Sequence, residues 1–384
     1  MRIVLSLLST LLLTVLASAA EEEPVDILSN ELGNPEGMVD RLVFFDTAQS
    51  WLAGETDRVG VLAEDSPWLV LADPRDSYPR RGTWESPEMI ADFPFTEMIP
   101  SWNARTPEST GVMIEARVRD VATGKWSPWL YFGQWGTTPT SPYRKVRFDG
   151  GAVRVDVLRL AAPADAFQTR VRLYAFNFEP TVVPSLRRVA VSYSGLVEDE
   201  KERAALAEAE PPQGEWARDL GVSFITQQDG PEGIKGSICS PTSVTMVTSF
   251  WGAARPLTEN AAAIYDPDYG IFGNWSRATQ RAGELGLDAW VTRMRTWNQV
   301  KAAIASGTPV IASIRFTPEE MPSAVFKQSN GHLIVIRGFT PEGDVIVNDP
   351  ASRERGDGAI YPAEELARAW FAKGGVAYII KPAS

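Results

Sequence analysis

The sequence contains one cysteine and one histidine, Cys239 and His332, and these two side-chain types together can perform nucleophilic catalysis at an amide. Cys239 lies in the step SICSPT, directly before an apolar run at residues 244–251 with helical spacing. Pro241 suits the first turn of that helix. Free backbone N–H groups and the helix dipole lower the pKa of a thiol at such a position. On this stretch alone, a buried cysteine acting as a small hydrophobe is the competing interpretation.

A carboxylate is predicted beside the histidine. His332 opens the apolar run HLIVIRGF, and Asp349 ends the next run, DVIVNDP. Strands over residues 333–337 and 345–348 would form a hairpin around a turn at 340–343, so the start of one and the end of the other meet at one end of the sheet. Taken singly, His332 is more often structural and Asp349 an ordinary turn acid. Together with the thiol, they form the pattern of a candidate nucleophile site, in which the carboxylate orients the imidazole.

An acyl-transfer site also needs donors for the developing oxyanion. Gln227, in FITQQDG, is the candidate side-chain donor beside the Cys239 backbone N–H, and Gln228 is the competing choice. No metal is expected, because one histidine and one cysteine are too few for a zinc site, and Asp266 and Asp268 are too few for a calcium loop. No other cofactor is expected.

The elements that must position these residues form an α+β domain over residues 217–384. Thr296 and Gln299 have the spacing of a capping box, which predicts a helix over 297–306 that stops at Gly307. Buried or alternating runs predict further elements, namely strands at 310–314, 333–337, 345–348 and 376–381 and a helix at 363–371. Helices early and antiparallel strands late are typical of α+β domains.

Residues 25–197 have the pattern of an all-β domain. Short β-rich runs between turn signals predict strands at 42–45, 68–72, 112–118, 129–132, 153–160, 171–178 and 189–193. This spacing predicts a β-sandwich, with a jelly roll as the expected topology. The charged, Ala-rich and then Pro-containing stretch at 198–216 predicts either a short solvated helix or a linker between the two domains.

The N-terminus and the overall charge indicate an exported protein. Residues 1–20 have the basic start, apolar centre and small-residue end of a signal peptide, so the protein is expected to be secreted or periplasmic, with no membrane span after cleavage. The formal net charge is −12, which disfavours nucleic acid as a partner. A single cysteine allows no internal disulfide.

Four blocks carry a family resemblance: TQQDG…GSICSPTSVTMVTSFWG, YDPDYGIFGNWSRAT, GTPVIASI, and NGHLIVIRGFTPEGDVIVNDPA. In this order they resemble the C39-like cysteine peptidases, papain-like domains of secreted bacterial proteins, over about residues 220–382. The resemblance implies a papain-like fold with Cys239 as nucleophile, His332 as base, Asp349 as orienting acid and Gln227 as oxyanion donor. Ser240 departs from the glycine that many relatives have after the cysteine.

A loop containing Asn274 and Trp275 also matches the family. Two roles stay open for it: it lines the substrate site, or Trp275 packs in the core, which is the somewhat favoured role for that residue. The better-known members are fused to ABC transporters. This chain has neither a phosphate-binding GxxxxGK[ST] loop nor a run of transporter helices.

The sequence therefore predicts an exported thiol hydrolase, a cysteine peptidase that cleaves peptide or protein substrates through an acyl-enzyme. Transpeptidation, deamidation or isopeptide cleavage at the same site is one alternative. The other is a non-catalytic protein that binds a cell-surface glycan through the β-sandwich, where Trp102, Trp126, Trp129 and Trp135 could stack on sugars. Packing in the core is the competing role for these tryptophans.

Overall fold

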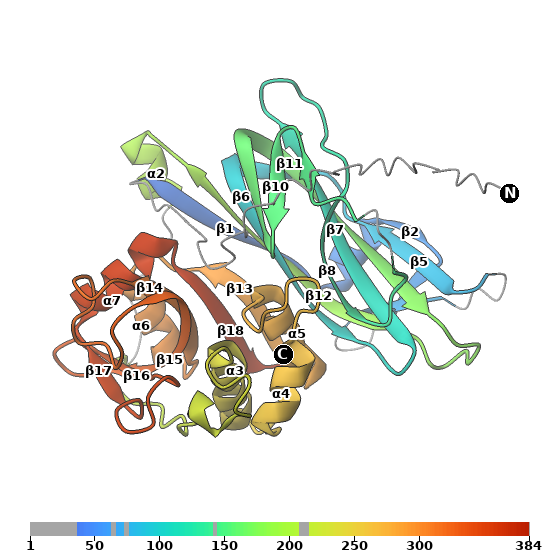
Figure 1. Cartoon of the computed structure of the whole chain (residues 1–384). Helices are drawn as coiled ribbons and strands as arrows, with labels where there is room; N and C mark the ends of the chain where they lie inside the picture. The colour runs from blue at the N-terminus through green and yellow to red at the C-terminus, as the bar shows by residue number, and fades with distance from the viewer. Residues whose placement is uncertain (1–36, 63–66, 73–76, 141–143, 207–214, 384) are drawn as a thin grey trace, which may run out of the picture.

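The computed structural model of the chain describes residues 37–62, 67–72, 77–140, 144–206 and 215–383 (Figure 1). The predicted signal peptide and part of the predicted linker lie outside these residues. The described chain is mostly β and has two domains, each built around its own sheet. None of the helices in the described part is long and apolar enough to cross a bilayer.

The N-terminal domain is a twelve-stranded antiparallel sheet system around an aromatic-rich core. Three long strands, β6 (Met89–Arg105), β11 (Val157–Ala175) and β12 (Ser185–Leu196), connect this sheet system. Strand β6 pairs with both β11 and β12. Strand β11 also pairs with β5, β7 and β10. A short helix, α1 (Ala48–Leu52), follows the first strand. The strands are β1 (Met38–Phe45), β2 (Glu55–Asp57), β3 (Val59–Leu62), β4 (Trp68–Leu71), β5 (Arg80–Glu85), β6 (Met89–Arg105), β7 (Thr110–Asp120), β8 (Leu130–Gly136), β9 (Arg147–Phe148), β10 (Gly151–Arg154), β11 (Val157–Ala175) and β12 (Ser185–Leu196).

All seven strands predicted for this domain overlap observed strands, but two features differ from the prediction. The run at 153–160 is not one strand, because the chain reverses at Val155 and Asp156 to form the β10–β11 hairpin. Strands β2, β3, β5, β6 and β9 were not predicted at all. The jelly-roll topology stays a prediction.

The C-terminal domain contains a six-stranded antiparallel sheet in the order β13-β18-β14-β15-β16-β17, with helices packed against it (Figure 1). Within the predicted linker, residues 200–206 form the helix α2 (Glu200–Leu206). The remaining elements are η1 (Gln227–Asp229), α3 (Cys239–Phe250), α4 (Leu257–Ile264), α5 (Trp275–Glu284), β13 (Leu287–Arg293), α6 (Trp297–Ala305), β14 (Val310–Phe316), β15 (Ser329–Phe339), β16 (Val345–Asn348), β17 (Ala359–Tyr361), α7 (Ala363–Ala369), η2 (Phe371–Lys373) and β18 (Val376–Pro382).

Local sequence signals account for several of these elements. Helix α6 begins with the predicted capping box. The Thr296 side chain accepts a hydrogen bond from the Gln299 backbone N–H, and the Gln299 side chain accepts one from the Thr296 backbone N–H. The predicted strand at 345–348 coincides with β16, and the other predicted strands and helices of this domain overlap β14, β15, α7 and β18.

The two domains meet along α5 and β6, where side-chain amides pair with the backbone of the opposite domain. Gln280 of α5 bonds both the N–H and the C=O of Ala104, at 2.7 and 2.9 Å. In return, Asn103 bonds the N–H and the C=O of Ala289 in β13, at 3.1 and 2.9 Å. These groups are buried, so their bonds replace water and fix the two domains in register.

Apolar packing and an ion pair continue the same interface. Ile99 and Val157 of the N-terminal domain belong to the buried cluster that surrounds α3 and the sheet of the C-terminal domain. Arg293 of β13, which is 3% exposed, pairs with Glu97 of β6 at 2.5 Å. The domains therefore share a buried core at this interface rather than a solvated contact.

Candidate active site

Cys239 is the first residue of α3, as predicted. This helix is buried on all sides over residues 240–248, because it lies between the sheet and the helices α4 and α5. The Ser243 hydroxyl donates to the Leu333 carbonyl at 3.1 Å, and the Ser240 and Tyr378 hydroxyls share a bond of 3.2 Å. These bonds fix the start of the helix, and with it the half-buried thiol, against β15 and β18.

His332 is the fourth residue of β15, whereas the prediction had it open the strand, and it lies close enough to Cys239 for each side chain to shift the pKa of the other. The pairing of β14 with β15 shifts register just before His332, an irregularity of the kind that often occurs next to active sites. The ring is 4% exposed and packs edge-on against Phe326, with ring centroids 4.9 Å apart. The Nε2 atom is engaged by Asp349 at 2.7 Å, so Nδ1 is the nitrogen left for the thiol.

Asp349 follows β16 and is completely buried. Its Oδ1 contacts His332 and accepts the Ala351 backbone N–H at 3.0 Å, while its Oδ2 accepts the Tyr361 hydroxyl at 2.7 Å. The predicted meeting of His332 and Asp349 at one end of the hairpin is therefore observed. Tyr361 was not predicted, and the short run AIY in which it lies contains no motif that would have indicated it.

The three groups shift one another's pKa values. Burial opposes the charged form of His332, but the carboxylate of Asp349 and the thiolate of Cys239 outweigh it and raise the pKa of the imidazole to about 10. Burial likewise opposes the thiolate, yet His332 and the backbone N–H groups of Leu333 and Ser240 lower the pKa of Cys239. Asp349 is desolvated too, and the imidazolium nevertheless lowers the pKa of that carboxyl. The arrangement therefore favours a thiolate–imidazolium pair at neutral pH.

Gln227 and Gln228 lie on η1, close to both ends of this group. The backbone N–H of Gln227 donates to the Pro350 carbonyl at 2.9 Å, next to Asp349, and the following Gly230 packs against Ile238, next to the thiol. The Gln228 amide is engaged with the Ala351 carbonyl at 3.3 Å. Within the described chain, the buried side-chain oxygen of Gln227 has no hydrogen-bond partner. Neither residue lines the cleft described below, and the choice between Gln227 and Gln228 as oxyanion donor stays a prediction.

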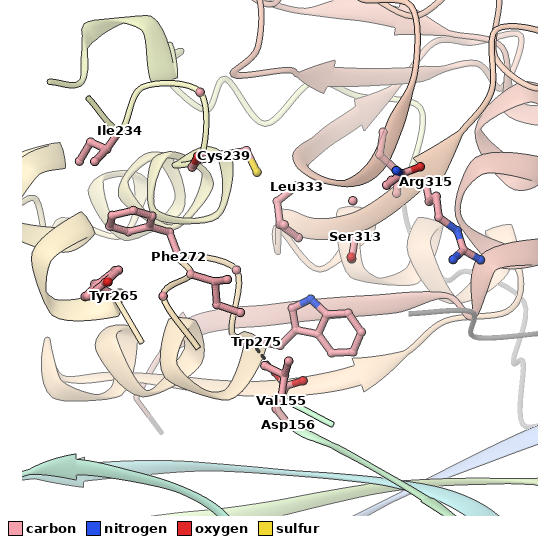
Figure 2. A pocket seen from close by; sticks show the side chains of 18 of the residues that line it. Val155, Asp156, Ile234, Cys239, Tyr265, Phe272, Trp275, Ser313, Arg315 and Leu333 are labelled. Carbon is pink, nitrogen blue, oxygen red and sulfur yellow. Dashed lines mark hydrogen bonds between the residues drawn. The ribbon is translucent and has the colours of Figure 1, made fainter. Parts of the chain in front are cut away.

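A cleft of about 1250 Å³ opens beside the thiol, and its lining is mostly apolar (Figure 2). Trp275 lines it and also belongs to the buried cluster around α3, at 6% exposure, so its position fits both the substrate-lining role and the core role, and the substrate-lining role stays a prediction. Asn274 does not line the cleft, because its buried side chain caps α5 by accepting the Arg277 N–H and donates to Asp266 at 2.7 Å. Unexpectedly, Val155 and Asp156 of the N-terminal domain also line the cleft.

The tryptophans considered for sugar stacking are mostly covered. Trp102 is fully buried and Trp135 is 6% exposed, so these two lie in the core, which was the competing prediction. Arg117 lies over the rings of both Trp126 and Trp129, at 5.0 and 4.6 Å from the centroids. These cation–π contacts occupy ring faces that a sugar would need.

Comparison with known proteins finds a family match for each of the two domains. Residues 219–378 match the sequence model of the Peptidase_C39 like family, and residues 41–194 match the Peptidase C39 N-terminal domain. No curated protein is similar enough in sequence to count as a match.

Among solved structures, part of the chain is similar to a double glycine motif protease from an AMS/PCAT transporter in complex with the leader peptide. The identity is 23%, the match covers 45% of this chain and 97% of that one, and the TM-score is 0.32. Xylellain, a cysteine protease from Xylella fastidiosa, matches 43% of this chain and 85% of its own at 11% identity, with a TM-score of 0.27. The C-terminal CBM6 of the laminarinase LamC from Zobellia galactanivorans covers 39% of this chain and 98% of its own at 9% identity, with a TM-score of 0.22.

The two family matches, in this order along the chain, carry more weight than these distant structural similarities. They agree with the blocks around Cys239 and His332 and with the β domain that precedes them. Residues 219–378 thus match a C39-like peptidase domain that follows the corresponding N-terminal domain, which supports a cysteine peptidase-like hydrolase.

Proposed function

We propose that this protein is an exported cysteine peptidase in which Cys239, His332 and Asp349 form the catalytic triad. The observation that carries the proposal is the arrangement of a thiol at a helix start, an imidazole beside it and a buried carboxylate hydrogen-bonded to that imidazole, next to an apolar cleft. Nucleophile, base and orienting group stand in the order that thiol acyl transfer requires.

The reaction begins on the thiolate–imidazolium pair. The sulfur of Cys239 attacks the amide carbonyl carbon, and the carbonyl oxygen takes the negative charge. The Cys239 backbone N–H and the Gln227 side-chain amide are the proposed donors to this oxyanion. As the C–N bond breaks, Nδ1 of His332 gives its proton to the leaving nitrogen, which leaves a thioester on Cys239.

Hydrolysis of the thioester regenerates the enzyme. His332, now neutral, takes a proton from water at Nδ1, the hydroxide adds to the thioester carbonyl, and the C–S bond breaks. The thiolate and the imidazolium are thereby restored. Asp349 remains ionised throughout, and its two firm partners besides His332, Tyr361 and the Ala351 N–H, hold it so that the ring keeps its orientation.

The test compares wild type with Cys239→Ala and Asp349→Asn on a mixed peptide library, read by mass spectrometry, together with labelling by iodoacetamide. Cleavage should be lost in Cys239→Ala and fall by orders of magnitude in Asp349→Asn, while the fold persists by circular dichroism. Wild-type thiol labelling no faster than that of free cysteine, with no cleavage lost in Cys239→Ala, would refute the proposal. Added amines distinguish hydrolysis from transpeptidation, since transfer products appear only in the second case.

Two further parts of the proposal concern location and surface binding. Export rests on the signal-like sequence of residues 1–20 and is tested by N-terminal sequencing of the mature protein, which should begin after Ala19 or Ala20. Glycan binding by the N-terminal domain has little support, because its best aromatic candidates are buried or covered by arginine. A glycan array with the full chain tests it directly.

A further inference from the structure

The cleft beside Cys239 is completed by a hairpin tip from the other domain. Strands β10 and β11 are joined by the two residues Val155 and Asp156, with Arg154 paired to Val157 across the turn. Both tip residues line the cleft, and Val157 directly after them is buried in the core of the C-terminal domain. In Figure 2 the tip enters below the ribbon of that domain, beside Trp275 and across the cleft from Cys239.

The backbone at this tip has an unfavourable conformation. Val155 has φ +59°, a region that favours glycine and that a β-branched residue rarely adopts. A two-residue hairpin loop with positive φ at its first position normally carries glycine there. The backbone conformation at this position would favour glycine, yet the residue is a valine. Residues in such unfavourable conformations are concentrated at functional sites.

Contacts from the C-terminal domain hold the tip in place. The Asp156 carboxylate caps α5 by accepting the N–H of Trp275 at 2.5 Å and that of Ser276 at 3.4 Å. With the Asp156 side chain engaged at the start of α5, the side chain of Val155 is what the tip presents to the cleft.

We propose that Val155 determines the substrate specificity of the peptidase. Its side chain, with those of Trp275 and Leu333, forms an apolar floor that receives an apolar side chain of the peptide and limits the size of that side chain. The N-terminal domain thus supplies part of the substrate site. This inference rests on the proposed peptidase function and adds to it the chemical class of one recognised residue.

Val155→Gly tests the inference, because glycine removes the side chain and suits the positive φ, so the hairpin should stay folded. Ser109→Gly is the matched control. Ser109 also has positive φ, at +62°, in a turn of the N-terminal domain that does not line the cleft. Val155→Ala shortens the side chain without introducing glycine and serves if the glycine variant fails to fold. All are made in the full chain.

The measurement is kcat/KM over a peptide library in which each position near the cleaved bond varies between aliphatic and aromatic residues. At one position, Val155→Gly should raise the ratio of aromatic to branched aliphatic substrates by about tenfold or more, with a smaller rise in Val155→Ala and none in Ser109→Gly. Unchanged ratios at every position, with cleavage still dependent on Cys239, would overturn the role of Val155 alone. Absence of any Cys239-dependent cleavage would instead overturn the proposed function, and this inference with it.

Discussion

The hydrogen bond from Tyr361 to the triad carboxylate permits a quantitative prediction. In Tyr361→Phe, Asp349 loses the donor to its Oδ2, which lies 2.7 Å from the hydroxyl. Both residues are at most 1% exposed, so water cannot replace the bond. A bond to a charged group contributes about 1.5–3 kcal/mol, against about 0.5–1.5 kcal/mol for a neutral one. We therefore expect the free energy of unfolding at pH 7 to fall by about 2 kcal/mol or more.

Tyr378→Phe is the control for the charge in this bond. The Tyr378 hydroxyl is also buried, but it pairs with the neutral hydroxyl of Ser240 at 3.2 Å. Its loss should lower the free energy of unfolding by only about 1 kcal/mol. Urea denaturation of the two variants and wild type gives the comparison.

The pH dependence separates the two variants further. The pKa of Asp349 is lowered in the folded protein, so its stabilising contribution is present above the unfolded pKa of about 3.9 and is lost as pH falls through the folded value. The effect of Tyr361→Phe should therefore shrink in acid, while that of Tyr378→Phe should not. Equal losses of stability in both variants at pH 7 would refute the claim that Tyr361 supports an ionised Asp349.

Further predictions concern the interface and the thiol. The pKa of Asp156 is raised to about 7, because burial outweighs its bonds to the start of α5, so wild type should lose stability as pH rises from about 4 to about 7. In Asp156→Asn this decline, of up to about 4 kcal/mol, should be absent from urea denaturation curves, and an unchanged decline would contradict it. Glu97→Gln leaves the buried Arg293 without its closest charge partner and should reduce the free energy of unfolding by about 3 kcal/mol; a loss below about 1 kcal/mol would argue against an interdomain role for the pair. Iodoacetamide labelling of Cys239 should reach half of its maximal rate at a lower pH than labelling of a free thiol does, and a rate that rises through about pH 8.5 like a free thiol would argue against the ion pair.

The sequence predicts the triad well, because it depends on short-range rules. Cys239 is positioned by a helix start, and His332 and Asp349 are brought together by one hairpin whose register follows from its own turn. Tyr361 completes the same group from a strand that has no distinguishing pattern. Its contact with Asp349 depends on the pairing of β17 with β16, and this pairing is part of the tertiary structure that no local sequence pattern specifies.

The hairpin tip at Val155 shows the opposite case. Arg154, Asp156 and Arg159 alternate with apolar residues, and this pattern predicts one continuous strand over residues 153–160 with one solvent-exposed face. A turn was not expected, because valine is unfavourable at positive φ and no Gly or Asn marks the position. The contacts of the other domain decide this conformation, and no local rule includes them.

The shared core has a consequence for how the protein can be divided. Residues 217–384, expressed by themselves, would lack the bonds from Asp156 to the start of α5 and the bonds from Asn103 to β13. They would also lack the backbone partners of Gln280 and one border of the cleft beside Cys239. The C-terminal domain is therefore not expected to keep its structure and its complete cleft when it is fused to another protein without the N-terminal domain. A chimera intended to inherit its selectivity would have to carry the preceding β domain as well.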